Sequence, residues 1–325
     1  MNNYIDLHLH LDGAITADIA RKLANMQGIE LEAKSDDELN AMLRVPSDCK
    51  NLMEFLKCFA LPCKLLQTKE AISEAVYLVL EKCKNDGCVY VEIRYAPQLH
   101  TDKGLCQEDA IQAAIEGLKR SDMRANLILC CMRAKDNHEA NLETVRLAGK
   151  YLVKTGGVVA VDLAGAESLI PAIEFKYIFD EANKLGVPFT IHAGEDGGAD
   201  NVRLAIEFGA SRVGHGVHIN EDMSVVELVK NKGICLEMCP TSNIQTCSVS
   251  SMDKHPVVEY LKAGLKVTIN TDDPAIEGTT IGREFEIIKE YFDLDAAMIK
   301  QLMLNAVDAA FTSDEVKEEL RKLYV

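Results

Sequence analysis

The chain has 325 residues, of which 48% are hydrophobic and 26% are charged. That composition fits one large globular domain or two modest ones. Acidic residues outnumber basic residues by 51 to 35, which gives a formal net charge of −16. A surface this acidic repels a phosphate backbone, so the composition argues against a nucleic-acid partner and favours a neutral small molecule.

Cysteine usage and the N-terminus indicate a reducing compartment. The 11 cysteines form no CxxC pair, which is typical of reduced cysteines that pack as small apolar residues. The first residues, Met1-Asn2-Asn3-Tyr4, contain neither a basic nor an apolar leader segment. No apolar run approaches the roughly 18–20 residues that cross a bilayer. We therefore expect a cytoplasmic protein without a membrane partner, and its oligomeric state stays open.

Short apolar runs alternate with amphipathic stretches along the chain. Eight runs have the length and β-branched content of strands, at residues 5–8, 89–95, 126–131, 158–163, 189–192, 212–214, 234–238 and 267–270. Helical periodicity is clearest at residues 72–84, 108–121, 142–154 and 174–185. Eight strands that each lead into helix predict a single α/β domain over residues 1–325, a (β/α)8 TIM-type barrel. A doubly wound open sheet is the alternative.

The longest departure from this rhythm follows the first strand. Residues 16–27 and 51–84 have helical periodicity without a strand between them, so we expect a helical insertion over residues 11–87. An insertion at this point lies at the C-terminal rim of a barrel, where ligands bind. Its second part carries an apolar stripe that fits either an ordinary core face or a lid over a flat ligand, formed by Met53, Phe55, Leu56, Phe59 and Leu61.

Metal-capable side chains end several of the predicted strands. His8 and His10 are two residues apart on the first strand, so both imidazoles point to the same face. Burying two imidazoles together is costly unless something coordinates or hydrogen-bonds them. His192 ends the fifth strand, and Asp272 follows the eighth. Three histidines, one carboxylate and a free position are what a hydrolytic metal site requires.

Other polar residues are less informative on their own. His215 follows the sixth strand and belongs with the strand-end group. Glu237 lies on the seventh strand, but the neighbouring Met238 could equally face the interior, so we assign Glu237 no role. The remaining histidines lie in predicted loops or helices without partners, and we expect structural or solvated roles for His100, His138, His218 and His255.

Six segments contain or accompany these residues: His8-Leu9-His10-Leu11-Asp12-Gly13, Asp162-Leu163-Ala164-Gly165-Ala166-Glu167, His192-Ala193-Gly194-Glu195, Gly214-His215-Gly216, Cys239-Pro240-Thr241-Ser242-Asn243 and Asn270-Thr271-Asp272-Asp273-Pro274. In combination they resemble the adenosine deaminases, which are zinc-dependent (β/α)8 enzymes of the amidohydrolase superfamily. The resemblance extends from about Ile5 to the helix after Arg283. Each segment alone is a weak signal, whereas the combination is highly specific.

The resemblance implies hydrolytic deamination of adenosine and 2′-deoxyadenosine to inosine and ammonia, in purine salvage. The partner is then a small purine nucleoside. The cofactor is one zinc ion per chain, held by His8, His10, His192 and Asp272. Glu195 would protonate the purine N1, and His215 would orient the attacking water and take its proton. Asp272 and His10 would also act on the water and the substrate.

The same resemblance assigns the remaining substrate contacts. Asp273 would hydrogen-bond the purine N7, and the backbone of Gly165 would meet N3. Asp12 would bind the ribose 5′-hydroxyl group. Phe55 and Phe59 would lie in the lid, an assignment that depends on helical phase rather than on a motif.

Three alternatives share parts of this pattern. An adenine deaminase or a deaminase of a modified adenosine is the closest, but relatives of those kinds resemble this motif with Glu or Asn in place of Asp12. A binding or signalling barrel without chemistry would have at least one altered ligand or acid position, and none is altered. A general metal-dependent hydrolase of amides or lactones fits the zinc ligands but not Glu195 and Gly165 together.

Overall fold

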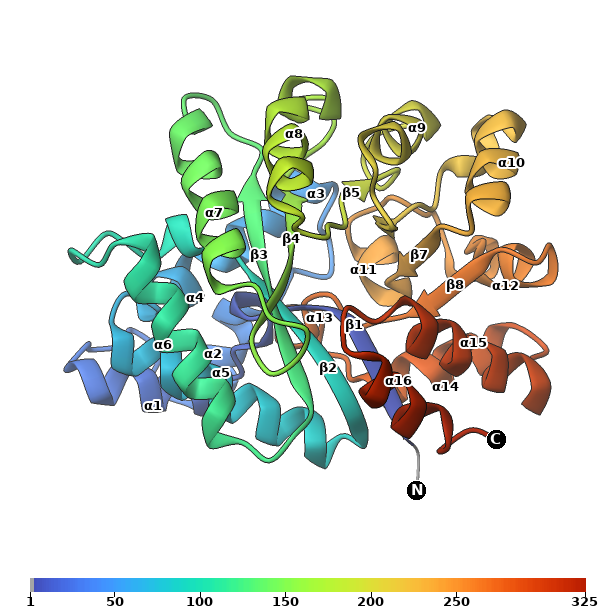
Figure 1. The fold of residues 1–325 in the computed structure, drawn as a ribbon. Coiled ribbons are helices and arrows are strands. Elements are labelled where there is room, and N and C mark those ends of the chain that lie inside the picture. Colours follow the sequence, from blue (N-terminus) through green and yellow to red (C-terminus); the bar gives the residue numbers. More distant parts are fainter. Residues whose placement is uncertain (1–2) are drawn as a thin grey trace.

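Eight strands form the centre of the computed structural model, which describes residues 3–325 (Figure 1). They are β1 Tyr4–His10, β2 Cys88–Tyr95, β3 Ala125–Met132, β4 Val158–Ala164, β5 His192–Ala193, β6 Arg212–His215, β7 Cys235–Met238 and β8 Lys266–Ile269. Two parallel ladders run in chain order, β1-β2-β3-β4 and β5-β6-β7-β8. In a barrel each strand pairs with the next strand along the chain, whereas the strand order of a doubly wound sheet reverses near its middle.

The two ladders join at both edges. On one side the Thr190 amide donates to Val161 O at 3.1 Å, and on the other the Asp272 amide donates to His8 O at 2.8 Å. The His10 amide in turn donates to Asp272 O at 2.8 Å. These bonds close the sheet on itself. The predicted (β/α)8 barrel is therefore confirmed, and the open sheet is wrong.

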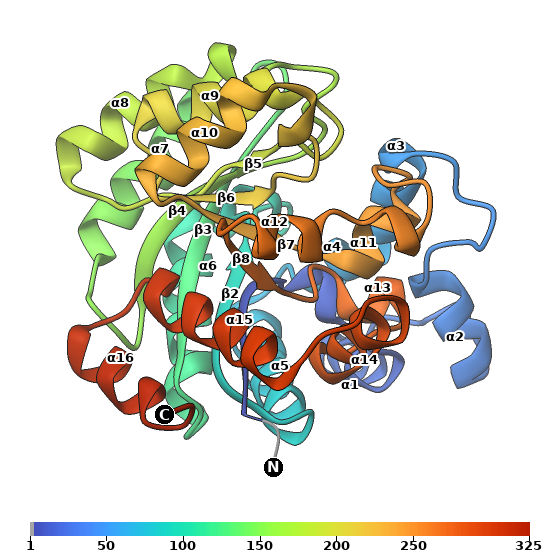
Figure 2. The same cartoon turned by 90° about the vertical axis from the view of Figure 1, so that its right-hand side faces the viewer.

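Helices surround the barrel and connect successive strands (Figures 1 and 2). The α8 helix ends as the sequence predicts, at Gly186, whose φ of 68° is left-handed and whose amide closes the last turn onto Asn183 O. The helices are α1 Ala17–Gln27, α2 Asp36–Leu43, α3 Leu52–Phe55, α4 Ala60–Leu65, α5 Lys69–Asn85, α6 Gln107–Arg120, α7 His138–Tyr151, α8 Lys176–Leu185, α9 Ala199–Phe208, α10 Met223–Lys232, α11 Pro240–Gln245, α12 Val257–Lys262, α13 Pro274–Glu277, α14 Ile281–Tyr291, α15 Ala296–Ala309 and α16 Asp314–Arg321.

Two elements differ from the sequence-based expectation. The fifth strand is regular only at His192–Ala193, because Pro188 has no N–H and its segment meets β4 through isolated bonds. The stretch 51–84, expected to be helical without a strand, is divided into three helices and a 3-10 turn. Pro62 removes a backbone donor there, and Thr68 starts α5 afresh by accepting the Ala71 amide at 3.2 Å.

The segment between β1 and β2 carries α1 to α5. Its middle part lies against the segments that follow β7 and β8, where the Val45 amide donates to Ile276 O at 3.0 Å and the Cys247 thiol lies 3.6 Å from Cys49 O. Figure 2 shows α3 beside α11 in this region. Phe55 packs there in a separate apolar cluster with Leu52, Cys58, Ala166 and Ile276. Within residues 3–325, no helix is long and apolar enough to cross a membrane.

Candidate active site

A cavity of about 310 Å³ opens at the C-terminal ends of the strands. Its volume lies at the small end of the range for sites that bind small molecules. Every residue that the sequence singled out for the site lines this cavity except His8, which is fully buried beneath it. The lining residues among them are His10, Asp12, Phe55, Phe59, Gly165, His192, Glu195, His215, Asp272 and Asp273.

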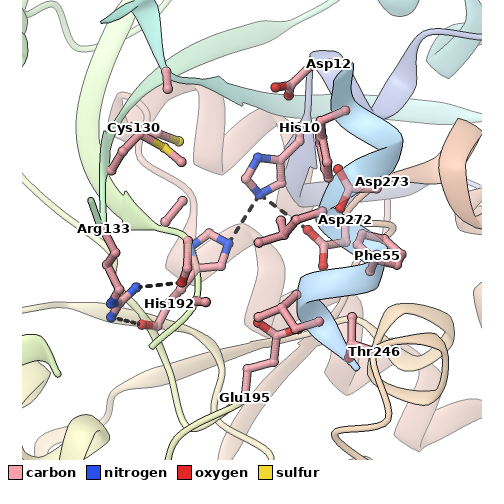
Figure 3. Close-up of a pocket in the computed structure, with 18 of the residues that line it drawn as sticks. His10, Asp12, Phe55, Cys130, Arg133, His192, Glu195, Thr246, Asp272 and Asp273 are labelled. Atoms are coloured by element: carbon pink, nitrogen blue, oxygen red, sulfur yellow. Dashed lines mark hydrogen bonds and ion pairs between the residues drawn. The ribbon is translucent and has the colours of Figure 1, made fainter. Parts of the chain in front are cut away.

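The metal-capable cluster is defined as His8, His10, His192 and Asp272. Figure 3 shows His10, His192 and Asp272 together in the cavity wall, and His8 is buried beneath the cavity. The His192 Nε2 atom is 3.1 Å from His8 Nε2 and 3.2 Å from His10 Nε2. The Asp272 Oδ1 atom is 3.2 Å and 3.3 Å from the same two nitrogens. Metal–ligand bonds of about 2.0–2.1 Å place tetrahedral ligands about 3.3 Å apart, so these four separations are compatible with one zinc ion.

His215 lies close enough to be a competing ligand. Its ring belongs with His8, His192 and Asp272 to a set whose ligand atoms all lie within 4.8 Å of one another. The distance from His215 Nε2 to Asp272 Oδ2 is 3.8 Å, longer than the distances among the four cluster atoms. That set does not include His10, although His10 Nε2 is closer to Asp272 than His215 Nε2 is. Distances therefore do not choose between His10 and His215, and the hydrogen bonds of the His215 ring are the remaining evidence.

Two buried carboxylates fix the orientation of two cluster imidazoles. His8 Nδ1 lies 2.8 Å from Glu237 Oε2, and His192 Nδ1 lies 2.9 Å from Asp162 Oδ2. A proton on each Nδ1 faces its carboxylate, which leaves the Nε2 lone pair directed at the cluster centre. Carboxylate partners of this kind orient ligating histidines and increase their basicity.

Arginine charges keep these carboxylates ionised. Arg94 lies 2.9 Å from Asp162 and 2.7 Å from Glu237, and Arg212 lies 2.6 Å from Glu237 on its other side. Burial alone raises the pKa of Glu237, but Arg212 and Arg94 hold that pKa well below its ordinary value. The sequence analysis missed Glu237, Arg94 and Arg212. The signal available was a charged residue inside each of three apolar strands, β7, β2 and β6.

His215 and Asp272 share an unusual backbone conformation. Their φ angles are 61° and 62°, in the left-handed region that residues other than glycine rarely adopt. His215 is the last residue of β6 and pairs with Ala193, and Asp272 forms an isolated bridge with Leu9 beyond the end of β8. Such strained positions concentrate at functional sites, where the surrounding fold enforces them.

The loop that carries Glu195 is fixed by hydrogen bonds from its backbone amides to one carboxylate. The Glu167 carboxylate accepts the backbone amides of Gly194 at 3.1 Å, Glu195 at 2.5 Å and Gly197 at 2.7 Å. The Glu195 carboxyl lies 3.5 Å from His215 Nε2. Burial raises the pKa of Glu195 well above its ordinary value, and the negative charges of Asp272 and Glu167 add to the rise. This environment favours the protonated form of the carboxyl, which is able to donate a proton.

Asp12 and Asp273 present unsatisfied oxygens to the cavity. The Oδ1 atom of each is buried without a hydrogen-bond partner. Burial raises the pKa of Asp12 to about 6. Burial, followed by the charges of Asp272 and Asp12, raises the pKa of Asp273 well above its ordinary value. A Cβ at Gly13 would lie 1.7 Å from Asp273 Oδ1, so only glycine leaves room for this carboxyl. Figure 3 shows Asp12 and Glu195 on opposite sides of the cluster.

Apolar side chains cover the remaining wall. Phe55 is almost fully buried, and its ring centroid lies 6.2 Å from that of Phe59. Both line the cavity, together with Met53 and Leu56 from the same apolar stripe. Leu61 instead packs against the main core of the barrel. The expected stripe is thus divided between the cavity and the core.

The carboxylate partner of His8 leads to a test of the metal site. Replacing Glu237 by Gln should weaken zinc affinity by about 10- to 100-fold, because the imidazole then faces a neutral amide instead of the carboxylate that orients it and increases its basicity. Competition with a chromophoric chelator measures the change. Glu92→Gln is the matched control, since Glu92 is as buried and also pairs with Arg212, at 2.6 Å, but has no histidine contact in the structure. Equal losses in both variants would contradict the role of Glu237.

Comparison with known proteins agrees with the resemblance read from the sequence. A family model described as adenosine deaminase matches residues 4–324. The adenosine deaminase of Haemophilus ducreyi is 47% identical over 322 residues, which is 97% of this chain and 94% of the relative. The adenine deaminase structure from Arthrobacter aurescens is 26% identical with a TM-score of 0.90, and the match covers 100% of this chain and 98% of the Arthrobacter chain. The structure of the Arabidopsis N6-mAMP deaminase is 26% identical with a TM-score of 0.85, and the match covers 99% of this chain and 97% of that chain. This chain therefore belongs to the adenosine deaminase family.

Proposed function

We propose that this chain is a zinc-dependent deaminase that hydrolyses adenosine and 2′-deoxyadenosine to inosine and ammonia. The observation that carries the proposal is a buried carboxyl with a raised pKa beside a metal-capable cluster in one cavity. Glu195 supplies the proton, and His8, His10, His192 and Asp272 supply the ligand atoms, whose spacing fits zinc.

The reaction replaces the amino group on C6 of the purine by the oxygen of water. Zinc, when bound, supplies a Lewis acid that lowers the pKa of water from about 15.7 toward about 7. Attack on C6 pushes an electron pair onto N1. Glu195 donates its proton to N1 at that moment, and its raised pKa keeps the proton available at neutral pH. The proton removed from the attacking water then passes to the C6 amino group, and the C–N bond breaks to release ammonia. The remaining hydroxyl proton returns to Glu195 as the C6 carbonyl forms.

The protonation states of the cavity carboxyls match the hydrogen-bonding pattern of a purine. N7 has a lone pair and no proton, so a carboxylate would be repelled there, whereas a protonated carboxyl donates to it. The raised pKa of Asp273 supports the protonated form. Gly165 lines the same cavity, and its backbone is proposed to meet N3. The segment 11–87 is proposed as the helical insertion of the barrel, with Phe55 and Phe59 as the lid that excludes water.

The charges around the cavity favour a nucleoside over a nucleotide. Among the described lining residues, Arg133 is the one guanidinium or ammonium group. Its Nη atoms donate to His192 O at 2.7 Å and to Leu163 O at 3.1 Å, so its charge is committed to the backbone. A phosphate would therefore find no free cation and would meet the Asp12 carboxyl. Asp12 instead suits the ribose 5′-hydroxyl group, which also favours adenosine over adenine.

A substrate panel tests the proposed function directly. Ultraviolet absorbance should report rapid deamination of adenosine and 2′-deoxyadenosine, and little or no turnover of adenine and AMP. The purified protein should contain one equivalent of zinc, and chelation should abolish turnover until zinc is restored. Full activity of the metal-stripped protein would contradict the metal assignment. Preference for adenine or AMP would contradict the substrate assignment.

The acid role of Glu195 predicts a large kinetic loss without metal loss. Glu195→Gln keeps the size and shape of the side chain but cannot deliver a proton, so kcat should fall by roughly 10²–10⁴-fold. Zinc content should stay near wild type, because Glu195 is not a proposed ligand. Asp196→Asn is the control, since Asp196 is the next carboxyl along the chain and does not line the cavity. A metal-free Glu195→Gln protein that regains full rate with added zinc would show that Glu195 serves the metal instead.

The proposed role of Asp12 predicts a loss specific to the sugar. Asp12→Ala should penalise adenosine and spare 5′-deoxyadenosine, which lacks the 5′-hydroxyl group. A hydrogen bond to a charged group contributes about 1.5–3 kcal/mol, or roughly 10- to 150-fold in kcat/KM. Steady-state kinetics on both nucleosides measure the change. Equal losses on the two, with a lower Tm, would mean that Asp12 only stabilises the first loop.

A further inference from the structure

A buried chain of hydrogen bonds reaches His215 from behind. The Val257 amide donates to His255 Nδ1 at 3.3 Å. His255 Nε2 lies 3.1 Å from Asn243 Oδ1, and Asn243 Nδ2 lies 3.1 Å from His215 Nδ1. The Asn243 side chain is fully buried, and those of His215 and His255 are nearly so. Neither Asn243 nor His255 has a role in the proposed chemistry described above.

The first link determines the tautomer of His255. A backbone N–H is always a donor, so the Nδ1 atom that receives it carries no proton. The single proton of the neutral ring is therefore on Nε2. Burial lowers the pKa of His255 to about 3, which keeps the ring neutral at working pH. His255 thus acts as a donor toward Asn243.

The second link determines the orientation of the Asn243 amide. A donor from His255 requires the amide oxygen opposite it, which turns the amide nitrogen toward His215. The Asn243 backbone is held on both sides, because its amide donates to Cys239 O at 2.9 Å and its carbonyl accepts from Val249 at 2.8 Å. His215 Nδ1 therefore receives an N–H. In the neutral ring the proton of His215 is on Nε2.

This tautomer is the opposite of the one that the cluster histidines adopt. His8 and His192 face carboxylates through Nδ1, at 2.8 Å and 2.9 Å, and direct an Nε2 lone pair at the site. His215 faces an amide donor through Nδ1 and directs an Nε2 proton at the site. A nitrogen that carries a proton neither coordinates a metal ion nor accepts a proton from water.

We propose that Asn243 and His255 are positioning residues that keep the proton of neutral His215 on Nε2, so that His215 donates a hydrogen bond to the attacking water. This assignment differs from the base role that the family resemblance implies for His215. It also excludes His215 as a metal ligand and leaves that place to His10. Its catalytic meaning rests on the proposed function, whereas the tautomer itself does not.

The donor has defined neighbours within the site. His215 Nε2 lies 3.5 Å from Glu195 Oε2 and 3.8 Å from Asp272 Oδ2. A water oxygen held between these groups receives a hydrogen bond from His215, and its own proton is left for an acceptor. Glu195 is already protonated for its role as acid, so the free Oδ2 atom of Asp272 is the acceptor that remains.

Nitrogen NMR on the zinc-loaded protein tests the tautomer without substrate. Histidine labelled with ¹⁵N in the ring gives separate signals for protonated and unprotonated nitrogens, and His215→Gln assigns the signals of residue 215. The expected result is an unprotonated Nδ1 and a protonated Nε2. A protonated Nδ1, in a neutral or a charged ring, would overturn the proposal.

Substitution of the relay separates positioning from stability. In Asn243→Asp the carboxylate is an acceptor only, so the proton of His215 should move to Nδ1 and kcat should fall by about 10- to 100-fold with little change in KM. Asn126→Asp is the matched control, because Asn126 is equally buried but bonds to Tyr90 and Phe311 at the other end of β3. The control should keep the wild-type tautomer even where it lowers Tm. An Asn243→Asp protein with its proton still on Nε2 would contradict the relay.

Metal content provides an independent readout. His215→Gln should retain one equivalent of zinc, whereas His10→Gln should lose affinity, because only the second substitution removes a ligand. Zinc loss in His215→Gln with zinc retained in His10→Gln would overturn the assignment of His215 as a donor. A protein with the expected tautomer that fails to deaminate adenosine would refute the proposed function alone, so the two failures are distinguishable.

Discussion

The structure of the site depends on how the barrel balances the charges buried at its centre. Arg94 lies between Asp162 and Glu237 with none of the three exposed to solvent. An ion buried without a partner costs several kcal/mol, so each of these groups requires the others. The two carboxylates have a second use, since each also faces the Nδ1 atom of a cluster histidine. The same buried residues therefore balance the charges of the core and orient the histidines of the metal-capable cluster.

Much of this arrangement was predictable because it is encoded locally. The spacing of His8 and His10 places both on one face of a strand, and His192 and Asp272 come at the ends of other strands. Barrel topology brings such ends together, so the cavity and its strand-end residues follow from the order of the elements. The open-sheet alternative failed because the backbone at Asp272 bonds to β1 on both sides.

The hydrogen-bond partners of those residues could not be predicted from the sequence. Glu237 and His8 are 229 positions apart, and only the closed barrel makes Glu237 the acceptor for His8 rather than an anomaly in an apolar strand. His255 was expected to be structural, and its two hydrogen bonds, with the Val257 amide and with Asn243, exist only in the folded structure. Propensity carries no information on such bonds. The sequence likewise did not show where the helical stretch 51–84 is divided into α3, α4 and α5.

Anomalous diffraction at the zinc edge tests the central claim most directly. A crystal of the zinc-loaded protein should show one strong peak about 2.0–2.2 Å from the Nε2 atoms of His8, His10 and His192 and from Asp272 Oδ1. His215 should lie beyond coordination distance, with Asn243 still against its Nδ1 atom. A peak coordinated by His215 in place of His10, or a peak away from the four cluster atoms, would contradict the account.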